Sequence, residues 1–213
     1  MGDLHQPAPT GPLGPFELSG GALCLDFANT WGDRGRPESE GLHSYRELVA
    51  FALQAEALES EEAEALLQQA GWDAEAAEQA FAEARRLRES LYRLFSARAA
   101  GRRPPAGDLE RLNAYLPEAL AGLRLAPKGE GYAWRGADGG EALTSALRPV
   151  VRSAAELLTS SELDRVRECD GASCTWLFLD RSRNRSRRWC SMESCGNRAK
   201  ARRHYHRHAK ETG

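Results

Sequence analysis

Apolar residues recur at helical spacing along most of the chain that precedes a C-terminal group of cysteines. The clearest series follows Asp73 and places seven apolar residues on one face of a helix with 3.6 residues per turn: Ala77, Phe81, Ala84, Leu87, Leu91, Leu94 and Phe95. Because Pro104 and Pro105 cannot continue a helix, the pattern predicts one long amphipathic helix that ends before them.

Shorter helices are predicted around this one over residues 44–58, 61–70, 108–116 and 143–158. Ser44 and Glu47 have the spacing of a capping box, and Asp108 is placed to cap the helix that follows it. The last helix starts at residue 143 or at Pro149, since proline either fits the first turn of a helix or kinks it.

Two segments of the same part of the chain read as extended or irregular structure. Residues 120–125 and 132–134 predict a small β-hairpin whose turn lies at residues 128–131. Residues 23–27 are an apolar stretch that predicts a short strand or a buried turn.

These elements predict a mainly α fold with three regions along the chain. Residues 1–14 are rich in glycine and proline and are expected to be disordered, and residues 15–162 form a helical domain with the small hairpin. Residues 163–213 form a C-terminal module. The helical domain is long enough to bury its own core, whereas the module has few large apolar residues and needs a metal ion to fold.

Four of the five cysteines form two matched pairs in the C-terminal module. Four residues lie between Cys169 and Cys174, four lie between Cys190 and Cys195, and fifteen separate the pairs. Each pair supplies two thiolates from one turn, which fits a tetrahedral four-cysteine zinc site. The alternatives are disulfides, a redox pair and an iron–sulfur cluster. Disulfides would be expected with a signal segment, a redox pair with a Cys-x-x-Cys motif, and an iron–sulfur cluster with a ferredoxin spacing, and the sequence shows none of these three features.

The residues between and after the cysteine pairs predict a treble-clef-like zinc module. The apolar run at residues 176–179 reads as a strand, residues 180–186 as a turn, and residues 187–189 as the strand that returns. Asn197 is placed to cap a helix from residue 198 to about residue 210, because that segment contains no glycine or proline.

Charge is divided unequally between the two parts of the chain. Residues 165–213 hold 13 Lys+Arg against 5 Asp+Glu, a net charge of +8, whereas residues 1–164 carry −10 of the total of −2. With zinc and four thiolates included, the module keeps about +6. A basic module on an acidic domain predicts contact with nucleic acid, although some arginines are also expected to neutralise the zinc centre.

Two groups of cations are the candidate nucleic-acid contacts. The first group lies in and after the predicted turn: Arg181, Arg183, Arg185, Arg187 and Arg188. The second follows the predicted C-terminal helix: Arg198, Lys200, Arg202, Arg203 and Arg207. A helix with basic residues four positions apart fits a major groove, and about six phosphate contacts would give a log–log salt slope of roughly −5.

The motif Cys-x4-Cys-x-Trp-Leu-Phe-Leu-Asp-x-Ser-Arg-Asn-x-Ser-Arg-Arg-Trp-Cys-Ser-Met-x-x-Cys-Gly-Asn-Arg, over about residues 169–203, resembles the CGNR zinc-finger family. Residues 20–30, Gly-Gly-Ala-Leu-Cys-Leu-Asp-Phe-Ala-Asn-Thr, are similar to the start of the helical ABATE domain that is usually joined to this finger. The resemblance implies a bacterial protein of a group regarded as stress-related transcription regulators. It bears more directly on the architecture than on the activity.

Asp26 and Asn29 are polar residues in an otherwise apolar stretch. One hypothesis places both on the wall of a ligand pocket, which would make the helical domain a sensor. The alternative is structural, with Asp26 bonded to backbone or to an arginine, and with Asn29 or Thr30 capping a helix. Cys24, between leucines, is expected to be a small core residue.

No sequence feature indicates catalysis. The chain lacks a Gly-x-Ser-x-Gly motif, a P-loop, a dinucleotide fingerprint and a His-Glu-x-x-His motif, and four thiolates leave zinc no open position. We therefore predict that the protein is not an enzyme. It has no apolar segment that would span a membrane and no apolar segment at its start, which predicts the cytoplasm.

The combined prediction is a zinc-binding and DNA-binding transcription regulator. Its helical domain is expected to bind a small molecule or a protein partner, and a homodimer is compatible with one small finger per chain. Two alternatives stay open. One is an RNA-binding module, for which base stacking on an exposed Trp176 or Trp189 would be the signature, although both rings are expected to pack around the zinc core. The other is a protein-interaction adaptor whose basic finger docks on an acidic surface.

Overall fold

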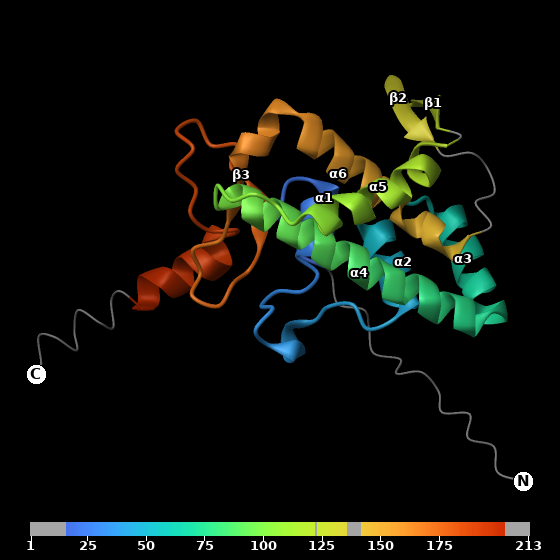
Figure 1. Cartoon of the computed structure of the whole chain (residues 1–213), viewed down its shortest axis with the longest axis horizontal. Helices are drawn as coiled ribbons and strands as arrows, with labels where there is room; N and C mark the ends of the chain where they lie inside the picture. Colours follow the sequence, from blue (N-terminus) through green and yellow to red (C-terminus); the bar gives the residue numbers. More distant parts are fainter. Residues whose placement is uncertain (1–15, 122, 136–141, 203–213) are drawn as a thin grey trace, which may run out of the picture.

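The computed structural model describes residues 16–121, 123–135 and 142–202 (Figure 1), so the predicted disordered start lies outside it. The helices are α1 (Leu23–Ala28), α2 (Tyr45–Gln54), α3 (Ser60–Trp72), α4 (Ala74–Ala99), α5 (Ala106–Leu120) and α6 (Arg148–Thr159). Short 3₁₀ turns lie at Pro37–Ser39, Leu143–Leu147 and Ser161–Arg165. The described strands form two antiparallel hairpins, β1 (Arg124–Lys128) with β2 (Gly131–Arg135) and β3 (Val166–Glu168) with β4 (Leu177–Leu179). The predicted mainly α class is confirmed.

The long helix α4 runs through the middle of the helical part, and other helices pack around it (Figure 1). Asp73 accepts a hydrogen bond from the Ala76 N–H at 2.9 Å and so caps the helix, as its position predicts. Every residue of the predicted apolar face is buried. Because α1, α2, α3 and α5 all contact α4, burial of this stripe is the main support of the fold.

Residues 23–28 form a helix, so the prediction of a strand or a buried turn is wrong. The buried residues of α1 are Cys24, Leu25, Phe27 and Ala28, which follow helical spacing, and the helix packs against α4 and α6. A helix this short is unstable by itself, and contacts with distant parts of the chain decide its conformation.

Two predicted helix starts have different outcomes. Ser44 accepts a hydrogen bond from the Glu47 N–H at 3.3 Å and caps α2 as predicted, but the reciprocal bond of the predicted capping box goes from the His43 N–H to the Glu47 carboxylate, and the helix ends at Gln54. Asp108 does not cap a helix, because it lies inside the first turn of α5, which begins directly after Pro105. Its carboxylate instead forms an ion pair with Arg93 of α4 at 2.5 Å, which fastens α5 to α4.

The segments between α5 and the cysteines agree with the predictions in type but not in every bound. The hairpin of β1 and β2 is confirmed, with Leu125 opposite Trp134 and Pro127 opposite Tyr132. Its first strand is Arg124–Lys128 and not residues 120–125, because α5 continues past the predicted end at residue 116 to Leu120. The final helix combines the two predicted starts, since the 3₁₀ turn Leu143–Leu147 leads directly into α6, which has Pro149 in its first turn. Proline is tolerated there because the first N–H groups of a helix have no partner within it.

The C-terminal module contains a different hairpin from the predicted one. Strand β4 pairs with β3, which precedes the first cysteine, and Val166 lies opposite Leu179. Residues 187–189, the predicted partner strand, are irregular. Val166 of β3 enters the main core beside Leu177 and Leu179 of β4, and Glu168 of β3 accepts hydrogen bonds from Tyr92 and Ser96 of α4. Residues 187–189 add no side chain to that core, so contacts with the helical part select β3 as the partner.

The C-terminal helix begins earlier than predicted. A π-helical turn at Met192–Gly196 leads into a helix over residues 197–202. The capping residue is Ser191, whose hydroxyl accepts from the Ser194 N–H at 3.4 Å, and Asn197 instead lies within the helix. The hairpin followed by a helix agrees with the predicted treble-clef-like module, whose residues 203–210 lie outside the described residues.

Two buried clusters meet at β4. The larger one fills the helical part and also contains Val166, Leu177 and Leu179, so the core continues across the predicted boundary at residues 162 and 163. The smaller one joins Phe178 to the cysteines of the module. Among the helices that the structure describes, none combines the length and the apolar composition of a membrane-spanning segment.

Candidate metal centre

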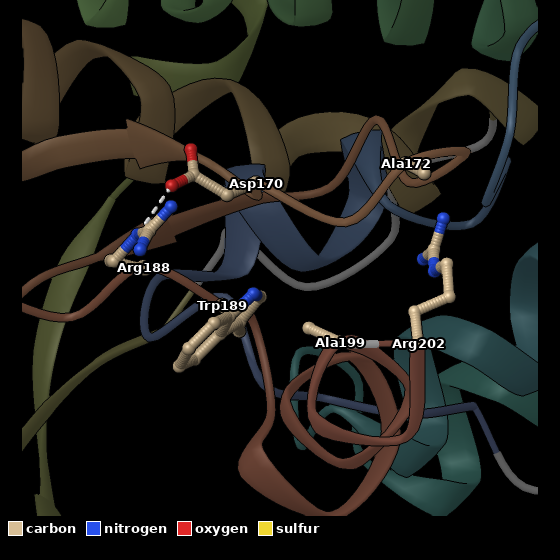
Figure 2. A pocket seen from close by; sticks show the side chains of 6 residues that line it. All are labelled: Asp170, Ala172, Arg188, Trp189, Ala199 and Arg202. Atoms are coloured by element: carbon tan, nitrogen blue, oxygen red, sulfur yellow. Dashed lines mark hydrogen bonds and ion pairs between the residues drawn. The ribbon is translucent and has the colours of Figure 1, made fainter. Parts of the chain in front are cut away.

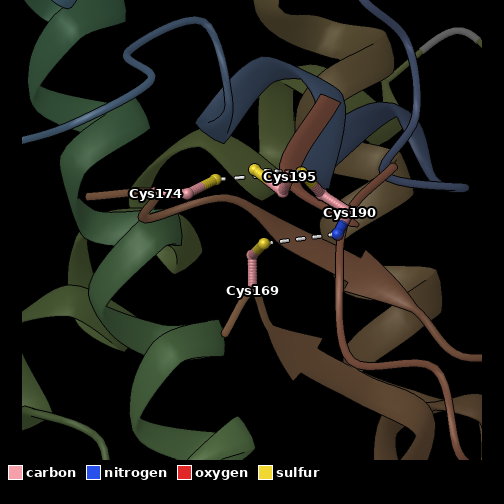
Figure 3. Close-up of side chains that lie close together, drawn as sticks. All are labelled: Cys169, Cys174, Cys190 and Cys195. Carbon is pink, nitrogen blue, oxygen red and sulfur yellow. Dashed lines mark hydrogen bonds between the residues drawn. The ribbon is translucent and has the colours of Figure 1, made fainter. Parts of the chain in front are cut away.

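The sulfur atoms of the four paired cysteines lie close together (Figure 3), and all four are within 4.8 Å of one another. Cys174 and Cys190 have their sulfur atoms 3.8 Å apart, and Cys190 and Cys195 have theirs 3.7 Å apart. A tetrahedral zinc ion with Zn–S bonds of about 2.3 Å needs sulfur atoms about 3.8 Å apart. All five cysteines of the chain are free thiols. The donor set and its spacing therefore fit a single structural zinc ion.

The first knuckle, residues 169–174, is the turn of the β3–β4 hairpin. The Cys169 N–H donates to the Trp176 carbonyl at 2.9 Å, and the Cys174 N–H donates to the Gly171 carbonyl at 3.1 Å. A β-carbon at position 171 would lie 2.9 Å from Cβ of Cys174 and 3.1 Å from Sγ of Cys195. Glycine is therefore required for the two knuckles to approach each other this closely.

The second knuckle, residues 190–195, ends in the π-helical turn of the C-terminal helix. Arg187 fixes the backbone at the start of this knuckle, because its guanidinium donates to the Trp189 carbonyl at 2.9 Å and also to the Cys190 carbonyl. The same guanidinium lies 4.4 Å from the ring centre of Phe178. Trp176 and Trp189 are half-buried against the cysteine cluster, as predicted.

Hydrogen bonds and charge repulsion set the protonation of the thiols. The N–H groups of Gly171 and Cys190 donate to Sγ of Cys169 at 3.4 and 3.3 Å. Hydrogen bonds from the Cys174 and Cys190 thiols lower the pKa of Cys169, and the contact with Cys169 raises the pKa of Cys174. Crowded thiolates repel one another, so all four ionise together only with a cation between them, which is the chemistry of a structural zinc site.

The helical part holds the first knuckle at both ends. Glu168 directly precedes the first cysteine, and its carboxylate accepts from the hydroxyl groups of Tyr92 at 2.9 Å and Ser96 at 2.7 Å, both on α4. Thr175 directly follows the second cysteine, and its N–H donates to the Gly32 carbonyl at 3.1 Å. The position of the first knuckle is therefore fixed by contacts that do not involve the metal.

Asn29 and Asp26 support strand β4 from α1. The Asn29 amide donates to the Leu177 carbonyl at 2.8 Å and accepts from the Leu177 N–H at 2.8 Å. The Asp26 carboxylate accepts from the Gly20 N–H at 2.7 Å, and the Gly20 carbonyl in turn accepts from the Leu179 N–H at 2.8 Å. Burial raises the pKa of Asp26 to about 6. The backbone contact of Asp26 matches the structural alternative, whereas the Asn29 side chain bonds to β4 and does not cap a helix as that alternative expected.

Cys24, the cysteine outside the metal centre, is fully buried in the main core. Burial raises the pKa of its thiol to about 12, and its backbone N–H donates to the Ser153 hydroxyl at 3.1 Å. A thiol that stays protonated inside an apolar core is an unreactive packing residue, as expected for this position.

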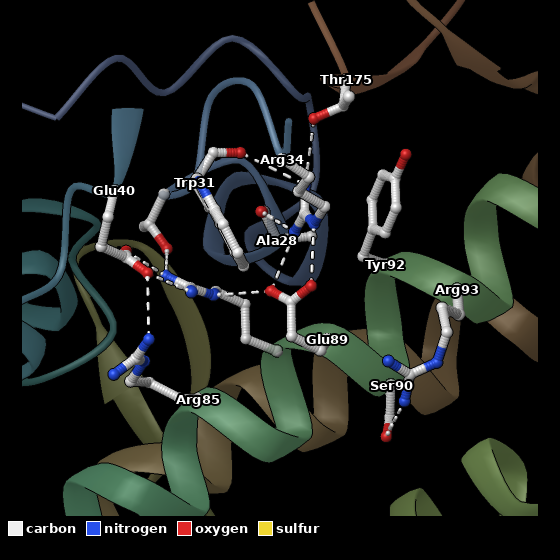
Figure 4. Close-up of polar contacts among 12 residues, drawn as sticks. Ala28, Trp31, Arg34, Glu40, Arg85, Glu89, Ser90, Tyr92, Arg93 and Thr175 are labelled. Carbon is white, nitrogen blue, oxygen red and sulfur yellow. Dashed lines mark hydrogen bonds and ion pairs between the residues drawn. The ribbon is translucent and has the colours of Figure 1, made fainter. Parts of the chain in front are cut away.

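An ion-pair network that the sequence analysis missed links the loop after α1 to α4 (Figure 4). The fully buried Arg88 donates two hydrogen bonds of 2.5 Å to Glu40 and one of 3.1 Å to Glu89. Arg34 donates to Glu89 at 2.9 Å and to the Thr175 hydroxyl at 3.3 Å. Through Thr175 the network reaches the edge of the first knuckle.

One sequence signal for this network was present. Arg88 lies on the predicted apolar face of the long helix, four residues after Ala84 and three before Leu91. A charge on a buried face requires an opposite charge nearby. Burial raises the pKa of Glu40, but the Arg88 guanidinium outweighs that effect and lowers it. The sequence does not reveal the partner, because Glu40 lies in a loop.

Several candidate nucleic-acid contacts face partners inside the protein. Arg181 forms an ion pair with Glu162 at 2.9 Å, and Arg188 forms one with Asp170 at 2.8 Å. The guanidinium of Arg187 is occupied by backbone carbonyls, as described above. These cations are partly compensated before any ligand arrives.

The other candidates differ in their surroundings. Arg198 donates to Sγ of Cys195 at 3.2 Å, so it partly neutralises the thiolate centre, as predicted for some arginines. Four cations are exposed and form no hydrogen bond or ion pair through their side chains with any residue that the structure describes: Arg183, Arg185, Lys200 and Arg202. Arg203 and Arg207 lie outside the described residues.

An open pocket of about 200 Å³ lies on the module between the first knuckle and the C-terminal helix (Figure 2). Its lining residues are Asp170, Ala172, Arg188, Trp189, Ala199 and Arg202. The Arg188 guanidinium lies 5.4 Å from the ring centre of Trp189. An aromatic ring beside cationic side chains is a surface on which a nucleobase can stack.

A helical domain joined to a hairpin, two cysteine knuckles and a helix defines a zinc-finger protein with an N-terminal helical domain. Residues 21–161 match the family model for ABATE, described as "putative stress-induced transcription regulator", and residues 165–208 match the CGNR zinc finger. The chain therefore belongs to the ABATE family and carries a CGNR zinc finger after that domain. No curated protein matches the chain.

Proposed function

We propose that this protein is a DNA-binding transcription regulator that contacts the phosphate backbone through its zinc module. Membership of a regulator family and the presence of a zinc finger support a regulatory role. The observation that carries the DNA proposal is a set of exposed cations without partners among the described residues, on a module that keeps a net charge of about +6 with zinc bound.

The tip loop, residues 181–186, favours this reading because its shape is fixed before binding. The buried Asp180 carboxylate accepts from the N–H groups of Ser182 and Arg187, each at 3.0 Å, and so holds both ends of the loop. Arg185 has a φ of 49°, a left-handed conformation that few residues other than glycine adopt. A preformed loop presents Arg183 and Arg185 with little ordering cost on binding.

The C-terminal helix adds a second contact region through Lys200 and Arg202. Four unpaired cations, each neutralising one phosphate, would give a log–log salt slope of about −3.6. That slope is shallower than the value of roughly −5 expected from the sequence, because several of the arginines are compensated by internal partners.

A second candidate function is binding of single-stranded RNA. The pocket beside Trp189 supports it, since the ring is half-buried and borders an open volume between Arg188 and Arg202. Stacking of unpaired bases on aromatic rings is typical of RNA recognition. A third candidate function is docking of the basic zinc module on an acidic protein surface. That function does not require the Trp189 ring.

The remaining parts of the proposal concern the whole protein. Four thiolates leave zinc without an open position for a substrate, so we assign the metal a structural role and the protein no catalytic activity. We assign the helical part the task of sensing a small molecule or binding a partner protein. The protein would act in the bacterial cytoplasm, and a homodimer would double the number of DNA contacts.

The experiment that tests this proposal is selection from random duplex DNA by zinc-loaded protein near physiological salt, followed by sequencing of the retained pool. The proposal predicts an enriched motif, and a spaced inverted repeat would indicate a dimer. The DNA reading fails if no motif is enriched and binding does not weaken with salt.

A variant separates the RNA reading from the DNA reading. Trp189→Leu removes the stacking surface but keeps an apolar side chain against the cysteine cluster. The RNA reading predicts that affinity for single strands falls by about fivefold to more than a hundredfold, since stacking of one base contributes about 1–3 kcal/mol. The DNA reading predicts that affinity for duplex DNA changes little, provided that each variant chain still binds one zinc ion.

A further inference from the structure

The β1–β2 hairpin carries a large exposed apolar face far from the zinc module. In the described structure each strand packs mainly against the other, and the hairpin projects beyond α5 (Figure 1). Tyr132 is 78% exposed, Leu125 63% and Trp134 56%. Directly opposite residues of an antiparallel pair point to the same side, so Leu125, Pro127, Tyr132 and Trp134 share one face.

The two edges of this hairpin differ in their ability to accept another strand. The two-residue loop of Gly129 and Glu130 is closed by the pair of Lys128 and Gly131. Backbone groups alternate between inward and outward along each strand, so the next pair, Pro127 with Tyr132, turns its backbone groups outward. Proline has no N–H, which blunts the β1 edge, whereas the β2 edge keeps its outward N–H groups.

We propose that the β2 edge pairs with β2 of a second copy of this chain. Antiparallel pairing of identical strands satisfies a two-fold axis, which would pass at the backbone of Ala133. Tyr132 would then lie opposite Trp134 of the second copy, and the same contact would occur twice. The two pairs supply roughly four hydrogen bonds, and aromatic cross-strand pairs are among the favourable ones in sheets.

The exposed area places this association among small interfaces. A buried aromatic side chain covers about 150–250 Å², so Tyr132, Trp134 and Leu125 together offer on the order of 400 Å² per copy. The dimer would thus bury roughly 800 Å² in total, which is below the 1,000–1,200 Å² or more of stable complexes. The structure therefore fits a weak dimer that dissociates on dilution.

A second copy fits this edge better than an unrelated strand. The outward positions of β2 hold one tyrosine and one tryptophan, and only an identical antiparallel strand places each of them opposite the other. The hairpin lies away from the tip loop, so both modules of the dimer would stay free. The pairing goes beyond the DNA-binding proposal and does not depend on it, because it is tested without nucleic acid.

The test is sedimentation equilibrium of the zinc-loaded full chain from about 1 to about 200 µM. Wild-type protein is expected to shift from monomer to dimer over this range. Tyr132→Pro removes one outward N–H but no hydrogen bond within the hairpin, and Trp134→Ser removes the aromatic contact. Both variants are expected to weaken the dimer at least tenfold while circular dichroism and zinc content stay unchanged.

Trp72→Ser is the matched control, because Trp72 at the end of α3 is 83% exposed and lies outside the hairpin. It is expected to dimerise like the wild type. The proposal is overturned if the wild type stays monomeric at every concentration, or if it dimerises but Tyr132→Pro and Trp134→Ser have no effect. Equal weakening by Trp72→Ser would also overturn it, since association would then follow general hydrophobicity.

Discussion

The two knuckles of the metal centre are held by different means. The first knuckle is fixed at both ends by the helical part, through Glu168 on one side and Thr175 on the other. The second knuckle is linked to the helical part through Arg187, which donates to the Ser19 carbonyl at 3.4 Å, and to the first knuckle through the Asp170 N–H, which donates to the Arg188 carbonyl at 2.9 Å. It otherwise depends on the helix that follows it and on the sulfur cluster itself. The metal therefore has unequal importance for the two halves of the module.

The first knuckle attaches the module to the helical part, and the second knuckle positions the C-terminal helix. Strands β3 and β4 belong to the core of the helical part, so the first knuckle follows the position of α4 and α1. The C-terminal helix, with Lys200 and Arg202, is joined to that frame by way of the second knuckle. Zinc would thus fix the position of Lys200 and Arg202 relative to the first knuckle.

Loss of the metal is the largest change that tests this comparison. Cys190→Ser removes one of four thiolates, and we expect it to abolish zinc binding, because structural zinc sites contribute about 10–16 kcal/mol. Hydrogen exchange should show lost protection over residues 190–202 and retained protection in β3, β4 and α4. Cys24→Ala, which removes the cysteine outside the site, should keep zinc. Equal loss of protection in β4 would contradict the comparison.

Asn29→Ala tests the anchored half directly. It leaves the buried N–H and carbonyl of Leu177 without partners, so the unfolding free energy of the zinc-loaded protein should fall by about 2–4 kcal/mol. Urea denaturation measures this change, and the exposed Asn113→Ala on α5 is the control. A loss below about 0.5 kcal/mol would mean that β4 does not depend on this contact.

Gly171→Ala tests the closeness of the two knuckles. The added β-carbon would meet Cβ of Cys174 at 2.9 Å and Sγ of Cys195 at 3.1 Å. Overpacking of this kind costs about 1–3 kcal/mol, so zinc affinity should fall by about tenfold to hundredfold in a competition with a chelator. Gly107→Ala on α5 has no atom within 4 Å of its new β-carbon, and it should leave zinc affinity unchanged.

Asp26→Asn should have the smallest effect and a distinct pH dependence. Burial raises the pKa of Asp26 from 3.8 to about 6, so the folded state binds the proton more tightly than the unfolded state. The unfolding free energy of the wild type therefore decreases as pH rises from about 4 to about 6. Asparagine cannot ionise but can still accept from the Gly20 N–H. The variant should be more stable by about 1–2 kcal/mol at pH 7, after allowance for solvent screening, and equal near pH 3.5.

Urea denaturation at several pH values measures the Asp26→Asn effect. Glu64→Gln, an exposed substitution on α3, serves as the control and should leave the difference between pH 4 and pH 7 as it is in the wild type. A variant that follows the wild-type pH dependence throughout would show that Asp26 is not the group responsible.

Local patterns in the sequence predicted the parts of the fold that depend on local chemistry. The apolar stripe of α4 extends over several turns, and the spacing of the four paired cysteines identifies them as the predicted zinc ligands. The pairing of β4 with β3 was predicted wrongly, because strand partners are chosen by burial against distant helices. The helical conformation of residues 23–28 has the same origin.

The ion pairs that connect distant segments could not be predicted from the sequence for a related reason. Arg88 stands out as a charge on an apolar face, but Glu40 is separated from it by most of three helices, and nothing local links them. In the same way, sequence alone treats all arginines of the module alike. The structure distinguishes Arg181, which is paired with Glu162, from Arg183, which has no such partner among the described residues.

The role of the exposed cations is tested most directly by the salt dependence of binding to duplex DNA for three zinc-loaded proteins. They are the wild type, the double variant Arg183→Gln with Arg185→Gln, and the double variant Arg181→Gln with Arg188→Gln. We expect the first double variant to reduce the log–log slope by about 2, and the second, which removes ion-paired arginines, to reduce it much less. Equal reductions in both variants, or an unchanged slope in the first, would contradict the claim that the unpaired cations of the module contact the phosphates.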